Sequence, residues 1–548
     1  MRKEWKIRKP FSQTQMLAKK YNLNPITVQL LLNRGIKEED FFSFLNPHSS
    51  LLLSPFLLPD MEKAVKRIKK AIEDKEKIFL FGDYDVDGIT SLVIFYEYLK
   101  NFTSSVSFYI PHRIEEGYGL NIEAIKRIKK EGASLLICFD CGTDACEQIE
   151  KAKSEGIDVI VVDHHTPKRR DFSPYAFINP KRVDSSYPFK ELSSAALSFK
   201  LVWALEEKLP LYLLDLVALS IVCDIVPLKG ENRIFLKEGI KWLRSGHRET
   251  INILCKAAKI DFHHLTPYHL GYILGPRINA SGRISSAKEA LNLFLVEDKK
   301  EKEKIAYQLE EYNQKRRAIE ARIIEEAESM VEDKEDFVYV LYKDGWHPGV
   351  LGIVASKFVE KYWRPTFIIG IDEMLGRGSA RSIPQINLVE ILNPCQEYLI
   401  EYGGHKKACG FKIYREYLEK FREKVNQITK EKLEGDYPSP FWDIDIEVKF
   451  KDINLSLLKE IEKLEPFGED NEPPLFLTSK VLPKSLPKKK NSKYSFWLSD
   501  GSLTLEAIVG DEQLIDIVNY GSYLDVIYYP ESPSLNQIRL VVKDLRLS

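Results

Sequence analysis

The clearest pattern in the sequence is an alternation of short apolar runs with amphipathic segments between residues 61 and 290. The runs IFLFG, LLICF and VIVV have the length of buried strands, whereas segments such as MEKAVKRIKKAIED repeat their apolar residues at helical spacing. This alternation predicts an α/β domain with a doubly wound parallel sheet. Its last part, 193–290, is predicted to be largely helical.

Four further segments are predicted around this domain. Residues 1–60 have helix-compatible apolar spacing and are expected to form a short helical segment. Residues 291–336 are expected to form a long connecting helix, because 297–336 contains no Pro or Gly and its apolar residues are spaced three and four apart. A smaller α/β domain with glycine-rich loops is expected over 337–438. Short β-branched and aromatic runs separated by turns predict an OB-like β-barrel over 439–548.

The composition is that of a chain that forms cores. Of 548 residues, 44% are hydrophobic, and 80 basic residues nearly balance 81 acidic ones, which gives a net charge of −1. These values exclude a disordered chain and a globally basic nucleic-acid binder. They leave a locally basic groove open, because binding in a groove depends on where the cations lie.

The sequence predicts no membrane contact and a reducing compartment. The start MRKEWKIRKP lacks the apolar stretch of a secretory signal. The most apolar stretch, Leu211 to Cys223, is too short to span a bilayer and predicts a buried helix. Seven cysteines, an odd number, favour reduced thiols, and the Cys138/Cys141 pair lacks a second pair for zinc. We therefore expect a cytoplasmic protein, and we expect it to be a monomer.

The most informative feature is a set of apolar runs that each end in aspartate. IFLFG, LLICF, VIVV and LVALSIVC, all taken here as strands, are followed by Asp83, Asp140, Asp163 and Asp224. One strand-terminal aspartate by itself is more often a helix cap. Four such residues, however, would converge in the crevice at the carboxyl ends of a parallel sheet. Asp85, Asp87, His164 and His165 continue two of the runs, so the set favours Mg²⁺ or Mn²⁺ over zinc.

These residues also carry a resemblance to a known family. The segments DYDVDG (83–88), CFDCG (138–142), DHH (163–165) and CDIVPL (223–228) resemble the four motifs of the DHH phosphoesterase superfamily. The segments GWHPGVLGIVASK (345–357), GRGSARS (376–382) and YGGHKKACGF (402–411) resemble its DHHA1 domain. PHRIEEGYGLN (111–121), GPRINASGRI (276–284) and LEPFGEDNEPPLF (464–476) are similar to the RecJ family of bacterial single-stranded-DNA exonucleases.

The resemblance implies a two-metal phosphodiesterase that degrades single-stranded DNA from 5′ to 3′ into 5′-mononucleotides, in DNA repair and recombination. It implies that Asp140 bridges two Mn²⁺ or Mg²⁺ ions. One ion would be held by Asp83 and Asp85, and the other by Asp87, His164 and Asp224. His165 would face the scissile phosphate, while Asp163 would orient the adjacent histidine.

Substrate contacts are expected in loops outside the metal site. GRGSARS, interpreted as a loop, offers backbone N–H groups, Ser379, Arg377 and Arg381 to a phosphate. Arg113, Arg277 and Arg283 are expected to complete a pocket for a 5′-phosphate. His405 follows two glycines and is expected to contact nucleic acid.

Aromatic and lysine residues give further candidates, each with a simpler alternative. Tyr118, Trp346 and Tyr402 are candidates for stacking on bases, and core packing explains each of them equally well. The segment 481–493 holds five lysines and no acidic residue, so it is either a solvated loop or a DNA contact of the barrel.

Two other functions compete with the exonuclease. One is a phosphoesterase of the same superfamily for short oligonucleotides or cyclic dinucleotides, and the other is a non-catalytic scaffold. The barrel argues against the first, and the full set of acids and histidines argues against the second. Expected partners are single-stranded DNA with a 5′-phosphate end, a single-strand-binding protein and a helicase.

Overall fold

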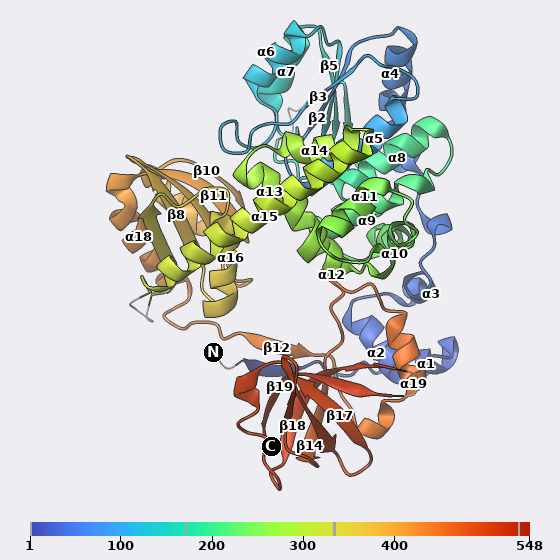
Figure 1. Ribbon diagram of the computed structural model, residues 1–548, viewed down its shortest axis with the longest axis vertical. Coiled ribbons are helices and arrows are strands. Elements are labelled where there is room, and N and C mark those ends of the chain that lie inside the picture. Colours follow the sequence, from blue (N-terminus) through green and yellow to red (C-terminus); the bar gives the residue numbers. More distant parts are fainter. Residues whose placement is uncertain (1–2, 170–172, 332–335, 535–536) are drawn as a thin grey trace. The chain divides into compact units, whose positions relative to one another are not determined.

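The computed structural model describes residues 3–169, 173–331, 336–534 and 537–548. These residues form two compact units (Figure 1). The first unit comprises Leu53–Asp224 and Glu238–Pro440, and the second comprises the N-terminal residues up to Leu52, Ile225–Lys237 and Phe441–Ser548.

The first unit is built on a five-stranded parallel sheet in the order β3-β2-β4-β5-β6. Its strands are β2 (Ile78–Gly82), β3 (Val106–Tyr109), β4 (Leu135–Phe139), β5 (Asp158–Val162) and β6 (Ala176–Ile178). Helices α6 (Ile122–Lys130) and α7 (Cys146–Ser154) cover one face, and α4 (Met61–Glu73), α5 (Val86–Leu99) and α8 (Ser194–Glu206) cover the other. Because both faces are covered, the central strands β2 and β4 are continuously apolar and buried. The predicted doubly wound sheet is confirmed.

A helical region follows this sheet. It contains α9 (Leu214–Cys223), α10 (Gly230–Arg244), α11 (Glu249–Ala257), α12 (Pro267–His269), α13 (Gly275–Ile284) and α14 (Ala287–Leu295). The run LVALSIVC lies in α9, which confirms the buried helix predicted for Leu211 to Cys223. The other interpretation of this run, as a strand ending in Asp224, was wrong. All but two of the ten residues of α9 are buried, and a short apolar run without polar alternation does not distinguish a strand from a buried helix.

The connecting helix α15 runs from Lys299 to Glu328. It begins where the Asp298 side chain caps the backbone N–H of Glu301 at 2.8 Å, so the first residues of the predicted segment 291–336 belong to α14. Residues 332–335 of that segment lie outside the described residues. The buried face of α15 follows a regular spacing of three and four residues: Ala306, Leu309, Asn313, Arg316, Glu320, Ile323 and Ala327.

The rest of the first unit is a mixed five-stranded sheet in the order β10-β11-β9-β8-β7. Its elements are β7 (Tyr339–Asp344), α16 (Leu351–Tyr362), β8 (Thr366–Asp372), β9 (Leu375–Arg381), α17 (Leu388–Leu392), β10 (Leu399–His405), β11 (Ala408–Tyr414) and α18 (Leu418–Lys432). Only β7 and β8 pair in parallel.

Both glycine-rich segments of this sheet were wrongly predicted to be loops. GRGSARS lies in β9, which pairs on both sides with β8 and β11, and YGGHKKACGF forms the β10–β11 hairpin. Gly378 lies under the ring of Phe411, where a Cβ would come within 2.1 Å of the ring. Gly378 therefore serves close packing inside the sheet.

The second unit contains a closed five-stranded barrel, which confirms the predicted OB-like fold. The ring is formed by β14 (Phe476–Pro483), β18 (Leu524–Glu531), β19 (Arg539–Leu547), β17 (Thr504–Val509) and β16 (Lys493–Ser499), and β16 returns to β14. Shorter strands β13 (Ile446–Glu447) and β15 (Lys488–Lys490) and helix α19 (Leu455–Glu462) accompany it.

The N-terminal segment packs on this barrel. Helices α1 (Thr14–Tyr21), α2 (Pro25–Asn33) and α3 (Phe41–Leu45) contribute apolar side chains to the barrel core. The segment is not purely helical as predicted, because β1 (Glu4–Ile7) pairs in parallel with β12 (Phe441–Ile444). No helix among the described residues is long and apolar enough to cross a membrane.

Candidate active site

The candidate site lies where the strand order of the parallel sheet reverses, between β2 and β4. Such a switch point opens a crevice at the carboxyl ends of the strands. Asp83 follows β2 and Asp140 follows β4, and their backbone N–H groups donate to Phe139 and Val162 of the neighbouring strands. Asp140 has a φ of 60°, a left-handed conformation that is uncommon for a residue with a side chain. The sheet therefore brings both carboxylates to one place.

The DYDVDG segment turns from β2 into α5. Oδ1 of Asp85 accepts hydrogen bonds from the backbone N–H groups of Asp87 at 2.9 Å and Gly88 at 3.2 Å, so Asp85 caps the helix. A Cβ on Gly88 would lie 2.5 Å from the backbone of Asp83. Glycine thus permits α5 to begin directly against Asp83.

Asp87 is buried against the first turn of α8 and the last turns of α9. Its carboxylate accepts hydrogen bonds from the backbone N–H groups of Ser194 and Ala195 in the first turn of α8, each at 2.8 Å. The Ser220 hydroxyl of α9 donates to it at 2.7 Å. These bonds fix the Asp87 carboxylate beside His164, whose Nε2 lies 3.8 Å from Oδ2 of Asp87.

His164 is surrounded by carboxylates. Its Nε2 lies 3.4 Å from Oδ1 of Asp140 and 3.5 Å from Oδ2 of Asp224. Those two oxygens, and Oδ1 of Asp83, are buried and accept no hydrogen bond from any described residue. Buried oxygens without donors fit the oxygen ligands that Mg²⁺ and Mn²⁺ prefer. Three sets of ligand atoms lie within reach of one ion: Asp83, Asp85 and Asp140; Asp87, His164 and Asp224; and Asp140, His164 and His165.

The electrostatics of this cluster also favour cations. Burial, followed by the neighbouring carboxylates, raises the pKa of Asp83, Asp140 and Asp224 well above the usual range. Burial and the charge of His165 lower the pKa of His164 to about 3, so its imidazole is neutral and able to bind a metal. Without cations, this many buried carboxylates cannot all be ionised.

Asp163 and His165 form a pair at the rim of the cluster. Oδ1 of Asp163 lies 2.7 Å from Nδ1 of His165, and Oδ2 accepts a hydrogen bond from the backbone N–H of Thr143 at 3.0 Å. Burial alone would raise the pKa of Asp163, but its bond to His165 holds that pKa well below the usual range. Burial likewise opposes a charged His165, and its bond to Asp163 nevertheless raises the pKa of His165.

Three arginines from different segments gather beside the carboxylates. Burial and the charges of Arg113, Arg316 and Arg381 lower the pKa of Arg283 to about 9. Burial and the charge of Arg113 also lower the pKa of Arg381. Arg113 itself lies over the ring of Tyr84, 4.7 Å from its centroid. Mutually repelling arginines of this kind favour a bound anion.

The first turn of α16 lies beside one of these arginines, Arg381. A Cβ on Gly352 would come within 2.9 Å of Nη2 of Arg381 and 3.0 Å of Oγ of Ser379. Arg283 donates to the backbone carbonyl of Gly349, just before the helix, at 3.0 Å. Backbone N–H groups at a helix N-terminus attract phosphate. Ser379 and Arg381 lie in the strand β9, and their side chains lie beside the first turn of α16.

Family models match the chain in three places: the DHH family N-terminal domain over residues 77–221, the DHHA1 domain over 335–431 and the RecJ OB domain over 444–543. The single-stranded-DNA-specific exonuclease RecJ of Escherichia coli is 31% identical over 441 residues, covering 75% of this chain and 76% of that protein. The chain belongs to the RecJ family.

Two other RecJ proteins are similar over most of the chain. RecJ of Bacillus subtilis is 36% identical over 490 residues, which cover 88% of this chain and 62% of that protein, so the match spans less than two thirds of it. The crystal structure of RecJ in complex with Mn²⁺ from Thermus thermophilus matches with a TM-score of 0.84 and 25% identity, covering 100% of this chain and 80% of that one.

Three other residues predicted for the substrate pocket have different surroundings. Arg277 pairs with Glu310 of α15, with 2.6 Å between Nε and Oε2. Arg377 donates from Nη1 to the backbone carbonyl of Ile114 at 2.8 Å. His405 is an exposed residue at the end of β10, and partial burial of its imidazole together with the charge of Arg381 lowers its pKa.

The three aromatic residues considered for base stacking differ in how far their side chains are exposed. Trp346 is 3% exposed and donates from Nε1 to Glu326, so it belongs to the core of the RecJ DHHA1 domain. Tyr402 is partly exposed, and its hydroxyl donates to Asn393. Tyr118 is 53% exposed, but its hydroxyl donates to the backbone carbonyl of Asp140 at 3.0 Å.

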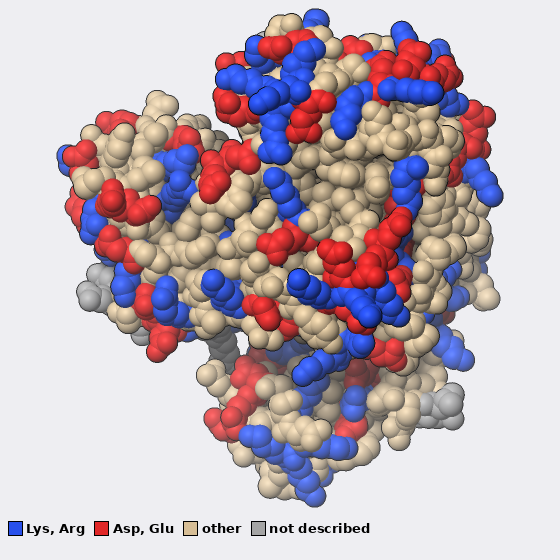
Figure 2. All heavy atoms as spheres, turned by 45° about the horizontal axis from the view of Figure 1, so that its top comes forward, with Lys and Arg blue, Asp and Glu red and all other residues tan. Residues whose placement is uncertain are grey.

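One aromatic residue of the RecJ OB domain was missed by sequence reasoning. Trp497 is 49% exposed and lines a cavity of about 330 Å³ with Lys488, Lys489 and Lys490. In β16 it points outward between the buried residues Phe496 and Leu498, an alternation that the sequence contains. Elsewhere the charges are mixed, and basic and acidic side chains alternate over the face in Figure 2.

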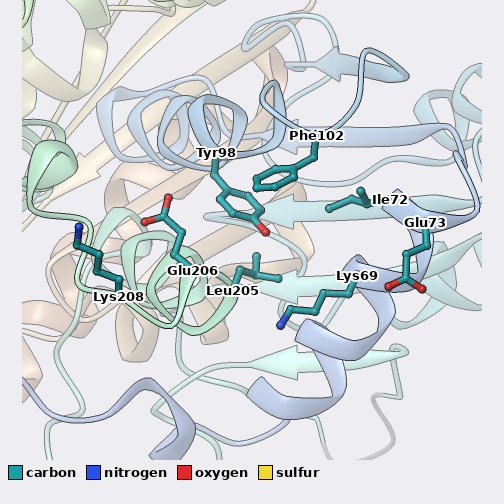
Figure 3. Close-up of a pocket in the computed structure, with 8 residues that line it drawn as sticks. All are labelled: Lys69, Ile72, Glu73, Tyr98, Phe102, Leu205, Glu206 and Lys208. Carbon is teal, nitrogen blue, oxygen red and sulfur yellow. The ribbon is translucent and has the colours of Figure 1, made fainter.

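A separate cavity of about 540 Å³ lies in the first unit, away from the predicted residues (Figure 3). The rings of Tyr98 and Phe102 lie 4.8 Å apart in its wall, and Lys69, Glu73, Glu206 and Lys208 surround it. Its charges are of both signs. None of the candidate site residues lines it, so we assign it no part in the active site.

Proposed function

We propose that this chain is a metal-dependent exonuclease that degrades single-stranded DNA from its 5′ end to 5′-mononucleotides. The observation that carries the proposal is a buried carboxylate and histidine cluster that shares Asp140 between two sets of ligands. Beside it lie Arg113, Arg283 and Arg381, whose charges repel one another. Several relatives in the RecJ family are named single-stranded-DNA-specific exonucleases, which supports the same substrate.

Two divalent cations, Mn²⁺ or Mg²⁺, would be held by this cluster. Asp83 and Asp85 would hold one and Asp87, His164 and Asp224 the other, with Asp140 between them. Bound there, such ions activate a water and stabilise charge on the attacked phosphate. Crystal structures of RecJ with Mn²⁺ and with Mg²⁺ support either ion.

His165 would act on the phosphate from the rim. Its bond to Asp163 raises its pKa and so favours the charged imidazolium, which would donate a proton or a hydrogen bond to a non-bridging oxygen or to the departing 3′ oxygen. Asp163 faces His165 and the backbone, so its role would be to orient that histidine.

The arginine pocket would hold the 5′-phosphate of the strand. Arg113, Arg283, Arg381, Ser379 and the first turn of α16 all offer donors there, and His405 lies nearby. Hydrolysis of the first phosphodiester breaks the bond from phosphorus to the 3′ oxygen and leaves a new 5′-phosphate on the shortened strand. The pocket would therefore receive the same group after every cleavage. Arg277 and Arg377 contact protein groups, which argues for structural roles.

The barrel would bind nucleotides of the DNA strand other than its 5′ end. Lys488, Lys489 and Lys490 offer contacts to phosphates, and Trp497 among them offers a ring for stacking on a base. A single-strand-binding protein and a helicase are the proposed partners, and a cytoplasmic monomer is the proposed state. All seven cysteines are free thiols, which fits a reducing compartment.

The alternative is a superfamily enzyme for short oligonucleotides or cyclic dinucleotides. The RecJ OB domain over 444–543 argues against this alternative, because a barrel that carries lysines would bind the phosphates of a long strand. Comparing hydrolysis of a long single strand, a duplex and a dinucleotide, with Mn²⁺ and with EDTA, tests the proposal. We expect metal-dependent hydrolysis of the long single strand above all. Preferred hydrolysis of the dinucleotide would favour the alternative.

A further inference from the structure

One loop connects the two parts of the proposed site. The segment 110–121 leads from β3 to α6 and carries both Arg113 and Tyr118. It is braced by Glu116, whose carboxylate accepts hydrogen bonds from the Tyr109 hydroxyl at 2.7 Å, the His112 backbone N–H at 2.8 Å and the Asn121 side chain at 3.1 Å. The loop is thus held by its own residues in one conformation.

Tyr118 points from this loop into the cluster. Its hydroxyl oxygen lies 3.0 Å from the carbonyl oxygen of Asp140 and 3.2 Å from Nδ1 of His165. Its ring meets the His165 ring edge-on, with 5.6 Å between the centroids. Gly117 and Gly119, with φ of 78° and 84°, flank the tyrosine and allow the backbone to present it in this direction.

A residue of the second sheet, Arg377 in β9, also contacts this loop. Nη1 of Arg377 donates to the carbonyl of Ile114, next to Arg113, at 2.8 Å. Arg377 lies on β9, the strand that also carries Ser379 and Arg381 of the proposed phosphate pocket. One strand therefore supplies the pocket and also fixes the loop that reaches His165.

We infer that Tyr118 and Arg377 are positioning residues that couple the 5′-phosphate pocket to His165. The Tyr118 ring lies against the imidazole, and the hydrogen bond from its hydroxyl to the Asp140 carbonyl keeps the ring in that place. Arg377 holds the loop that carries Tyr118 and Arg113. The inference rests on the proposed exonuclease function. It assigns Tyr118 a role other than base stacking and Arg377 a role other than phosphate binding.

Two substitutions at one position separate positioning from stacking. Tyr118→Phe keeps the ring and loses the hydroxyl, so we expect kcat on a 5′-phosphorylated single strand to fall about three- to tenfold, with KM unchanged. Tyr118→Leu loses both groups and should lower kcat at least as much. Tyr268→Phe, at an exposed tyrosine outside the site, is the control. A Tyr118→Phe enzyme with normal kcat, and a KM raised only by Tyr118→Leu, would overturn the inference in favour of stacking.

A double-mutant cycle tests the coupling. Arg377→Gln should lower kcat on a 5′-phosphorylated strand, and adding Tyr118→Phe should cost little more, because both changes release the same loop. Arg415→Gln, at an exposed arginine paired with Asp344 in the same sheet, is the matched control. Fully additive losses would overturn the coupling.

A readout without turnover keeps this result separate from the proposed function. Carbethoxylation of His165 by diethyl pyrocarbonate, followed by peptide mass spectrometry, reports how firmly the imidazole is held, with the exposed His264 as internal reference. We expect Tyr118→Phe and Arg377→Gln to change the rate at His165 at least twofold while the rate at His264 and the unfolding temperature stay the same. Unchanged labelling would overturn the inference even if the wild type is an exonuclease. Altered labelling supports it even if the wild type acts on another substrate.

Discussion

Oδ1 of Asp140 lies 3.4 Å from Nε2 of His164, in a buried position where Oδ1 accepts no hydrogen bond from any described residue. Asp140 and His164 belong to one set of ligand atoms that lie within 4.8 Å of one another. Burial raises the pKa of Asp140, and the neighbouring carboxylates raise it further. This is the relation of two ligands to one cation. It makes Asp140 the residue on which the metal centre depends most.

Replacing Asp140 should therefore abolish the metal centre. We expect Asp140→Asn to lower metal-dependent hydrolysis of single-stranded DNA by more than about 100-fold, which is above the loss typical for residues that only orient ligands. Calorimetric titration with Mn²⁺ should show fewer bound ions. Asp511→Asn, at an exposed aspartate of the barrel unit, is the control. Near-normal hydrolysis at saturating Mn²⁺ would rule out the bridging role.

The buried acids also predict how pH affects the metal-free protein. Burial and the charge of Asp85 raise the pKa of Asp87 to about 6 against the opposing hydrogen bond from Ser220, so the folded chain holds this proton more tightly than the unfolded chain. Stability should then fall as pH rises from about 4 through 6. We expect the apparent Tm in EDTA to drop by a few degrees over this range, and the stabilisation by Mn²⁺ to grow. A metal-free Tm that rises from pH 5 to 7 would contradict this.

The arginine pocket predicts a preference for phosphorylated ends. We expect the wild type to degrade a 5′-phosphorylated strand faster than a 5′-hydroxyl strand. Arg381→Ala should reduce the ratio of the two kcat/KM values about 10- to 100-fold, because a charge-assisted hydrogen bond to the phosphate is lost. Arg415→Ala should leave the ratio unchanged. Equal rates for both ends in the wild type would remove the basis for the pocket.

The lysines of β15 predict a salt dependence. Changing Lys488, Lys489 and Lys490 to Gln should make the plot of log affinity against log salt shallower, by about 0.7 for each phosphate that a lysine no longer neutralises. Filter binding of a long single strand measures this slope. The same change at Lys126, Lys129 and Lys130, exposed on α6, matches the change in net charge. Equal slopes for the two triple variants would argue against direct binding of phosphates by β15.

Much of the metal centre could be predicted because its residues follow buried strands directly. Asp83 and Asp140 are placed by the ends of β2 and β4, and a parallel sheet brings such ends together whatever the loops do. Asp224 was also predicted to belong to the cluster, although the apolar run that precedes it forms the helix α9 and not a strand. The end of α9 reaches the crevice too, and an apolar run of that length fits either element.

The wrongly predicted loop, and the protein partners of two predicted site residues, depend on pairing that no local pattern contains. Glycines suggested a loop at 376–382, but the pairing of β9 with β8 and β11 decides that they lie in a sheet. Arg277 and Arg377 belong to stretches typical of the family, yet their partners, Glu310 and the carbonyl of Ile114, come from distant segments. The direction of the Tyr118 hydroxyl likewise follows from the loop conformation.

The most direct test of the account is a time course of product release from a long single strand labelled at either its 5′ or its 3′ end. With Mn²⁺, we expect a 5′→3′ exonuclease to release the 5′ label at once as a mononucleotide. The 3′ label should stay in strands that shorten gradually. Neither product should form with EDTA or with Asp140→Asn. Early release of the 3′ label as a mononucleotide, or release of either label without metal, would contradict it.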